Sequence, residues 1–296
     1  MKVIDALKKE GTTLSFEFFP PKTEKGEKHL FEVIGKLKQF NPDFVSVTYG
    51  ALGTNADKSF YWVKEIKDHF KLEPNAHLTC VAADRHTMKE HLQRFASIGI
   101  NNILALRGDP PQGDNEFKAP ENGFKHASEL VAFIKKHEPK FCVGVAGYPE
   151  KHIESPSNED DIVHLKEKVD AGAEYIITQL FFDNRQFFAF RDRCREAGIS
   201  VPIVPGLMPI TSLQQIKKMT DICGASIPEE LWRNLEKHQD NAERVIKIGE
   251  EWTIKQCNEL LADAVPALHF FVMNQAGPIS AILKQTKDSV QGGISY

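Results

Sequence analysis

The predicted fold rests on one stretch, residues 141–182, which reads FCVGVAG at 141–147, DDIVHLKEKVDA at 160–171 and YIITQLFF at 175–182. The two outer runs are continuously apolar, which is typical of parallel strands covered on both faces. The middle run is amphipathic with helical spacing, and Gly172 follows it where a helix C-terminal glycine belongs. The stretch therefore predicts a strand, a helix and a second strand.

The same unit recurs along the whole chain of 296 residues. Strand candidates begin at Leu14, Asp43, Asn75, Asn101, Phe141, Tyr175, Val201 and Ala267. Helical patterns also cover 28–40, 60–70, 88–98, 127–137 and 187–197, with Gly198 ending the last of these. The gap after Val201 has room for one further unit plus extra helices, and 228–261 is predicted to be helical throughout.

Eight β-α units in fewer than 300 residues predict a single (β/α)8 barrel domain, α/β in class, over 1–296, with a frayed tail from about 286. An open doubly wound sheet is the competing architecture. It would be expected to carry a G-x-G-x-x-G turn, and the sequence has none.

Composition excludes several classes of function. The 37 basic and 41 acidic residues are interspersed and give a net charge of −4, which does not favour a nucleic-acid binder. No apolar stretch approaches the roughly 20 residues that span a bilayer, and residues 1–11 lack the apolar core of a signal peptide, so a cytoplasmic protein is expected. The five cysteines and eleven histidines show no metal-binding spacing, so no metal is expected.

Glu17 stands out because it lies between phenylalanines inside the first predicted strand. Side chains alternate along a strand, so Glu17 points either into the barrel or outward beneath a helix. One interpretation is a structural carboxylate paired with a lysine or arginine. The other is a general acid, since a carboxyl group in an apolar pocket has a raised pKa.

Polar residues also follow the other predicted strands, at the end of the barrel where (β/α)8 active sites lie. They include Thr48, His77, Arg107, Asp109, Tyr148, His152 and Gln179. Their convergence on one rim favours an enzyme over a structural barrel. Because no nucleophile or metal motif is present, a bound organic cofactor is expected to supply the difficult chemical step.

Several motifs occur in a characteristic order: SFEFFPPK (15–22), VSVTYGA (45–51), HLTC (77–80), LRGD (106–109), YPE-x-H (148–152), KVDAGA (168–173), ITQ-x-FFD (177–183) and PG-x-MP (205–209). From about Leu14 to Met273 the chain resembles the methylenetetrahydrofolate reductase family, in its short bacterial form. Longer eukaryotic relatives add a C-terminal regulatory domain, for which this sequence has no room, so that form of control is not expected.

The resemblance implies a flavin-dependent barrel that takes hydride from NADH or NADPH and passes it to 5,10-methylenetetrahydrofolate, in ping-pong order. Glu17 stands at the family's general-acid position, Asp109 matches a carboxylate close to flavin and folate, and Gln179 matches a folate and nicotinamide contact. The residues that match flavin-site positions are Thr48, Tyr49, Ala51, His77, Arg107, Gly108, Asp109, Ala127, Tyr148, His152, Asp161, His164 and Lys168. Small-molecule substrates and a homo-oligomer are expected.

The sequence departs from well-known bacterial members at a few of these positions. It has His126 before Ala127, then His164 and Glu167 on the next predicted helix, where those members have tyrosine, asparagine and arginine. These changes fall near the adenosine diphosphate half of FAD, which leaves FMN open as the cofactor. Gln275 replaces a folate-contacting arginine.

Two rival functions remain open at this point. The first is a pterin-binding methyltransferase barrel with a cobalamin partner. The second is a flavin- or folate-binding subunit of a larger reductase. The sequence does not reveal which nicotinamide is preferred.

Overall fold

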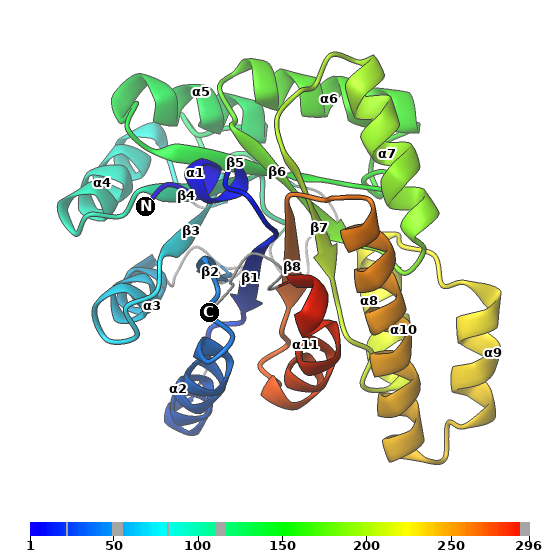
Figure 1. Ribbon diagram of the computed structural model, residues 1–296. Helices are drawn as coiled ribbons and strands as arrows, with labels where there is room; N and C mark the ends of the chain where they lie inside the picture. The colour runs from blue at the N-terminus through cyan, green and yellow to red at the C-terminus, as the bar shows by residue number, and fades with distance from the viewer. Residues whose placement is uncertain (22, 49–55, 82, 111–116, 291–296) are drawn as a thin grey trace.

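The computed structural model describes residues 1–21, 23–48, 56–81, 83–110 and 117–290. Eight parallel strands close into a barrel in chain order, with β1 pairing both β2 and β8 (Figure 1). The strands are β1 (Thr13–Phe18), β2 (Phe44–Val47), β3 (Pro74–Thr79), β4 (Asn102–Leu106), β5 (Cys142–Gly147), β6 (Tyr175–Leu180), β7 (Ile203–Leu207) and β8 (Ala267–Phe271). The predicted (β/α)8 barrel is confirmed.

Helices surround the strands on the outside, except for the first, which lies across the amino-terminal end of the barrel (Figure 1). They are α1 (Val3–Leu7), α2 (Glu24–Lys38), α3 (Ala56–Asp68), α4 (Arg85–Ser97), α5 (Ala127–His137), α6 (Asn158–Asp170), α7 (Asn184–Glu196), α8 (Leu213–Cys223), α9 (Glu229–Lys237), α10 (Ala242–Ala262) and α11 (Ala276–Val290). Gly172 and Gly198 have φ values of +117° and +77°, so both end their helices in the left-handed region as predicted.

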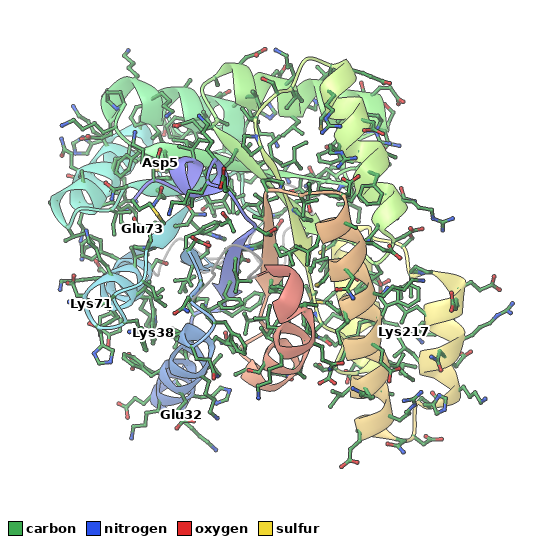
Figure 2. The ribbon with its side chains drawn as sticks, viewed as in Figure 1. Asp5, Glu32, Lys38, Lys71, Glu73 and Lys217 are labelled. Atoms are coloured by element: carbon green, nitrogen blue, oxygen red, sulfur yellow. The ribbon has the colours of Figure 1, made fainter. Side chains whose placement is uncertain are left out.

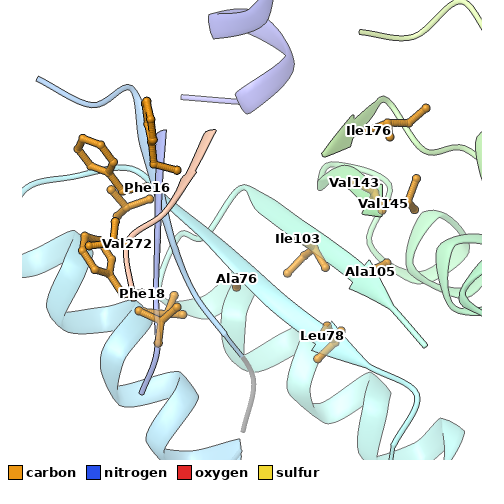
Figure 3. Packing of buried hydrophobic residues seen from close by; sticks show 14 of the residues in the cluster. Phe16, Phe18, Ala76, Leu78, Ile103, Ala105, Val143, Val145, Ile176 and Val272 are labelled. Atoms are coloured by element: carbon orange, nitrogen blue, oxygen red, sulfur yellow. The ribbon is translucent and has the colours of Figure 1, made fainter. Parts of the chain in front are cut away.

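The main core lies between the strands and the helices. Alternate side chains of each strand point outward into this layer, for example Phe16 and Phe18 from β1 and Ile103 and Ala105 from β4 (Figure 3). This arrangement explains why the strands are apolar on their outer faces. Figure 2 shows charged side chains such as Glu32 at the outer surface of the helices.

The barrel interior changes character along its axis. At the amino-terminal end of the strands, helix α1 contributes Val3, Ile4 and Leu7 to a cluster with inward-facing apolar residues such as Tyr175. Gly144 faces this tyrosine, and a side chain on Gly144 would collide with its ring. Towards the carboxyl-terminal end of the strands the inward-facing residues are polar, for example Glu17, His77 and Thr178, so a catalytic site is expected at that end.

One prediction about the helices needs correction. The region 228–261 is not one helix, because α9 ends at Lys237 and the Asn241 side chain caps a new helix by accepting from the Arg244 N–H. Asparagine favours such a cap over a helix interior. At the end of the chain α11 continues to Val290 and Thr286 is buried, and the frayed tail stays a prediction. Residues 291–296 lie outside the described part of the chain.

No helix within the described residues is long and apolar enough to cross a membrane.

Candidate active site

A cavity of about 400 Å³ opens at the carboxyl-terminal ends of the strands. Its walls come from β1, β3, β4, β5, β6 and β8, and from the segments after β4 and β5. Twelve of the predicted site residues line it: Glu17, His77, Arg107, Gly108, Asp109, Ala127, Tyr148, His152, Asp161, His164, Lys168 and Gln179. Residues spread over more than 160 positions of sequence therefore meet in one space.

Among the described residues, two predicted site residues are not part of this lining. Thr48 is half-buried at the end of β2, where its N–H donates to the Phe18 carbonyl. Gln275 is exposed just before α11. Tyr49 and Ala51 lie outside the described residues. The predicted flavin role of Thr48 and the folate role of Gln275 thus receive no support from the cavity.

Glu17 and His77 line the floor of the cavity, and Glu17 also contacts His269, which is not part of the lining. The His77 Nε2 atom, on β3, lies 3.2 Å from Glu17 Oε2, and the His269 Nε2 atom, on β8, lies 3.4 Å from the same oxygen. All three side chains are buried. Neither ring nitrogen has hydrogen-bond geometry toward a partner, so the contacts are ion pairs whenever an imidazole is protonated.

This geometry corrects the predicted pKa of Glu17. Burial would raise the pKa, but the two adjacent imidazoles outweigh it and lower the pKa to about 2. The neighbouring phenylalanines, which suggested an apolar pocket, point to the opposite face of β1 and pack beneath the helices. Glu17 is therefore an ionised carboxylate in contact with two imidazoles.

His269 is a functional candidate that sequence reasoning missed. Its Nδ1 atom lies 2.9 Å from Ser15 Oγ, so Ser15, His269 and Glu17 form a chain of contacts that runs up the inner face of β1 and β8. Strand alternation contained the signal, because Leu268 and Phe270 belong to the outer core and leave His269 facing inward. The run ALHFF (267–271) places His269 among apolar residues, as the first strand does for Glu17, and this pattern indicates a buried polar group.

Two cationic side chains lie along one wall of the cavity. Lys168 donates from Nζ to the Ala146 carbonyl at 2.7 Å, and burial lowers the pKa of Lys168 to about 8. Lys168 forms no ion pair with any described residue. Arg107, at the end of β4, is paired with Glu154. Both cations line the cavity, and an ammonium that forms no ion pair suits an anionic group such as a phosphate.

Gly108 and Asp109, which follow Arg107 directly, also line the cavity. Gly108 has a φ of +85°, and a Cβ atom there would lie 2.5 Å from Val81 Cγ2, so only glycine suits the position. The turn leaves the Asp109 side chain exposed at the mouth. Burial, and then the charge of Asp109, raise the pKa of Tyr148, which keeps that phenol neutral.

Three of the four residues that depart from the family pattern lie together in the cavity lining. The His126 and His164 rings are nearly parallel, at 7°, with centroids 6.4 Å apart. Glu167 Oε2 lies 3.3 Å from His164 Nδ1, and all three residues line the cavity. Glu167 therefore faces the site rather than open solvent alone.

Among the described residues there is no group of three or more histidine, cysteine, aspartate or glutamate side chains that could hold a metal ion.

Comparisons with known proteins agree with this architecture. The sequence profile of the family described as methylenetetrahydrofolate reductase matches residues 2–287. The 5,10-methylenetetrahydrofolate reductase of Escherichia coli K12 is 39% identical over 263 residues, which cover 89% of this chain and 86% of that protein. Methylenetetrahydrofolate reductase (NADH) 1 of Arabidopsis thaliana is 40% identical over 288 residues, or 93% of this chain and 49% of the relative.

A solved structure shares the fold. It is an uncharacterized protein from Clostridium thermocellum, described as binding two copies of 5-methyl-5,6,7,8-tetrahydrofolic acid, with a TM-score of 0.66, 17% identity and 96% of both chains covered. The chain spans about half the length of the plant relatives it matches and most of the length of the bacterial one. On the profile match and these identities, the chain belongs to the methylenetetrahydrofolate reductase family.

Proposed function

We propose that the chain reduces 5,10-methylenetetrahydrofolate to 5-methyltetrahydrofolate with NADH or NADPH, through a bound flavin that the two substrates reach in turn. The observation that carries the proposal is the cavity floor, where a buried carboxylate sits between two imidazoles beneath a rim of cations and aromatic groups. Membership of the family supplies the substrate class.

The residues of the cavity fit a flavin. Arg107 and Lys168 would hold its phosphate groups, Asp161 its ribose, and the Gly108 backbone its ring edge. The Lys168 ammonium, which donates to the Ala146 carbonyl but forms no ion pair with a described residue, is the feature that most favours an anionic ligand. When bound, the flavin would accept hydride from the nicotinamide and deliver it to the folate. FAD is the expected form, and FMN fits the same phosphate contacts.

The chain's own contribution is the movement of a proton to the folate. Because the adjacent imidazoles lower the pKa of Glu17 to about 2, its carboxylate is ionised at pH 7. The proton that opens the folate's five-membered ring would reach the substrate through the group of Glu17, His77 and His269. Ser15 fixes the far side of His269, which orients its ring toward Glu17.

Asp109 and Gln179 would position the folate. Asp109 places a negative charge at the mouth, which favours positive charge developing on the substrate. Gln179 lines the wall, and its side-chain oxygen accepts from the Leu180 N–H at 2.9 Å, which fixes the amide in the cavity.

The test is the visible spectrum of the freshly purified chain, followed by turnover. Absorption bands at about 450 and 375 nm are expected if the site holds an oxidised flavin. They should bleach with NADH or NADPH and return with methylenetetrahydrofolate. A chain that binds no flavin when flavin is added, or whose reduced flavin is not reoxidised by the folate, would refute the proposal. Mass analysis of the released cofactor distinguishes FAD from FMN.

A further inference from the structure

The guanidinium of Arg107 already holds an anion from within the chain. Its Nη1 donates to Glu154 Oε2 at 2.5 Å and its Nη2 donates to Glu154 Oε1 at 2.7 Å. This two-pronged geometry is the one that a guanidinium uses for a phosphate. The Glu154 carboxylate therefore takes up the same two N–H groups that a flavin phosphate would need.

The Arg107 side chain has more contacts and is less exposed than the Glu154 side chain. The Phe117 ring lies over the guanidinium, with Arg107 Cζ 5.2 Å from its centroid, and Arg107 Nε donates to the Gly108 carbonyl at 3.3 Å. The Arg107 side chain is 25% exposed, whereas the Glu154 side chain is 50% exposed. Glu154 is thus the member of the pair that is free to move away while Arg107 stays in place.

The other acids around the cavity do not hold an arginine. Asp161 Oδ1 accepts from Ser155 Oγ at 3.0 Å, and Glu167 lies beside His164. Asp109 forms no ion pair with a described residue. Glu154 is therefore the carboxylate placed to compete directly with a phosphate for Arg107.

We propose that Glu154 is an internal anion of the flavin-phosphate site, which occupies Arg107 and is displaced when a phosphorylated flavin binds. The inference rests on the proposed function, because it takes flavin as the ligand. On this inference Glu154 lowers the affinity for phosphorylated flavins. The affinity for a flavin without a phosphate group does not depend on it.

The experiment compares FMN with riboflavin, which lacks the phosphate. Each is titrated by flavin fluorescence into the unmodified chain, Glu154→Gln and the control Glu159→Gln, which removes an exposed carboxylate from the first turn of α6. An exposed ion pair of this kind corresponds to about a two- to five-fold change in affinity. Glu154→Gln should bind FMN tighter by that factor, with riboflavin binding unchanged, and Glu159→Gln should change neither.

A second pair of variants tests whether the effect passes through Arg107. In a chain that carries Arg107→Met, adding Glu154→Gln should leave FMN affinity unchanged, because the contested group is gone. An FMN affinity that Glu154→Gln leaves the same or weakens, or an equal change for riboflavin, would overturn the inference while flavin binding itself stands. If the unmodified chain binds FAD but neither FMN nor riboflavin, this inference fails while flavin binding stands, and if it binds none of the three, the proposed function fails as well.

Discussion

Replacing Glu17 by glutamine should separate the two halves of the proposed reaction. Transfer of hydride from the nicotinamide to the flavin requires no proton from the cavity floor, so Glu17→Gln should reduce its flavin at close to the unmodified rate. Reoxidation by methylenetetrahydrofolate requires that the folate amine be protonated. A glutamine keeps the shape of the side chain but has no charge to hold a proton between the two imidazoles.

The expected size of the effect follows from the geometry of the cluster. Glu17 is the carboxylate within 3.2 Å of His77 and 3.4 Å of His269, and no other described carboxylate contacts either ring. Without it, the site loses its positioned acid, which typically costs about 10²–10⁴-fold in rate. Reoxidation by the folate should slow by that factor. The pKa of Glu17 should also rise in His269→Asn, because one of the causes that lower it is removed.

Stopped-flow absorbance of the flavin measures each half-reaction separately, with Glu159→Gln as a control for exchange of a carboxylate for an amide. The pKa of Glu17 is measured by NMR of a ¹³C-labelled carboxyl group. If both half-reactions of Glu17→Gln slow together, the residue supports the barrel or the flavin instead. If neither half-reaction slows, the acid is a different residue. A Glu17 pKa near 6 or above in the unmodified chain would refute the reasoning that the two imidazoles keep this carboxylate ionised.

Four other predictions follow from the same structure. Asp109→Asn should retain flavin but react more slowly with folate, and its flavin midpoint potential should rise, because a negative charge at the mouth of the cavity is lost. If the rate and the potential are both unchanged, Asp109 does not have this role. Glu167→Arg should tighten flavin binding in a fluorescence titration, since the residue lines the cavity beside His164, and an unchanged dissociation constant would place its side chain away from the cofactor. Since the pKa of Lys168 is lowered to about 8, its ammonium is present below that pH and lost above it. FMN affinity should therefore fall as pH rises through about 8 while riboflavin affinity does not, and Lys168→Met should abolish this difference. Gly144→Ala should lower the free energy of unfolding, measured in urea, by about 1–3 kcal/mol, because the added methyl group collides with the Tyr175 ring. The control Gly35→Ala on α2 should not lower it, because no atom lies within 4 Å of the added methyl group.

The order of the elements could be predicted from the sequence because it depends on local patterns. Continuous apolar runs, amphipathic stretches and glycines such as Gly172 are read within a few turns of chain, and eight repeats leave little choice other than a closed barrel. The failure was also local. Asn241 starts a new helix inside a stretch with uninterrupted helical spacing, because its side chain caps the helix better than it fits within one.

The site could be predicted only in part, for a physical reason. Strand alternation and the rule that barrel sites lie at the carboxyl ends of strands brought residues such as His77 and Gln179 to one rim. The charge state of Glu17 depends on His269, which lies 252 residues away, and only closure of β8 against β1 brings them together. The pairing of Arg107 with Glu154 likewise spans two loops and leaves no local pattern. Residue types and their order are properties of the sequence, but pKa values and ion pairs depend on distances of a few ångströms, which the tertiary structure alone decides.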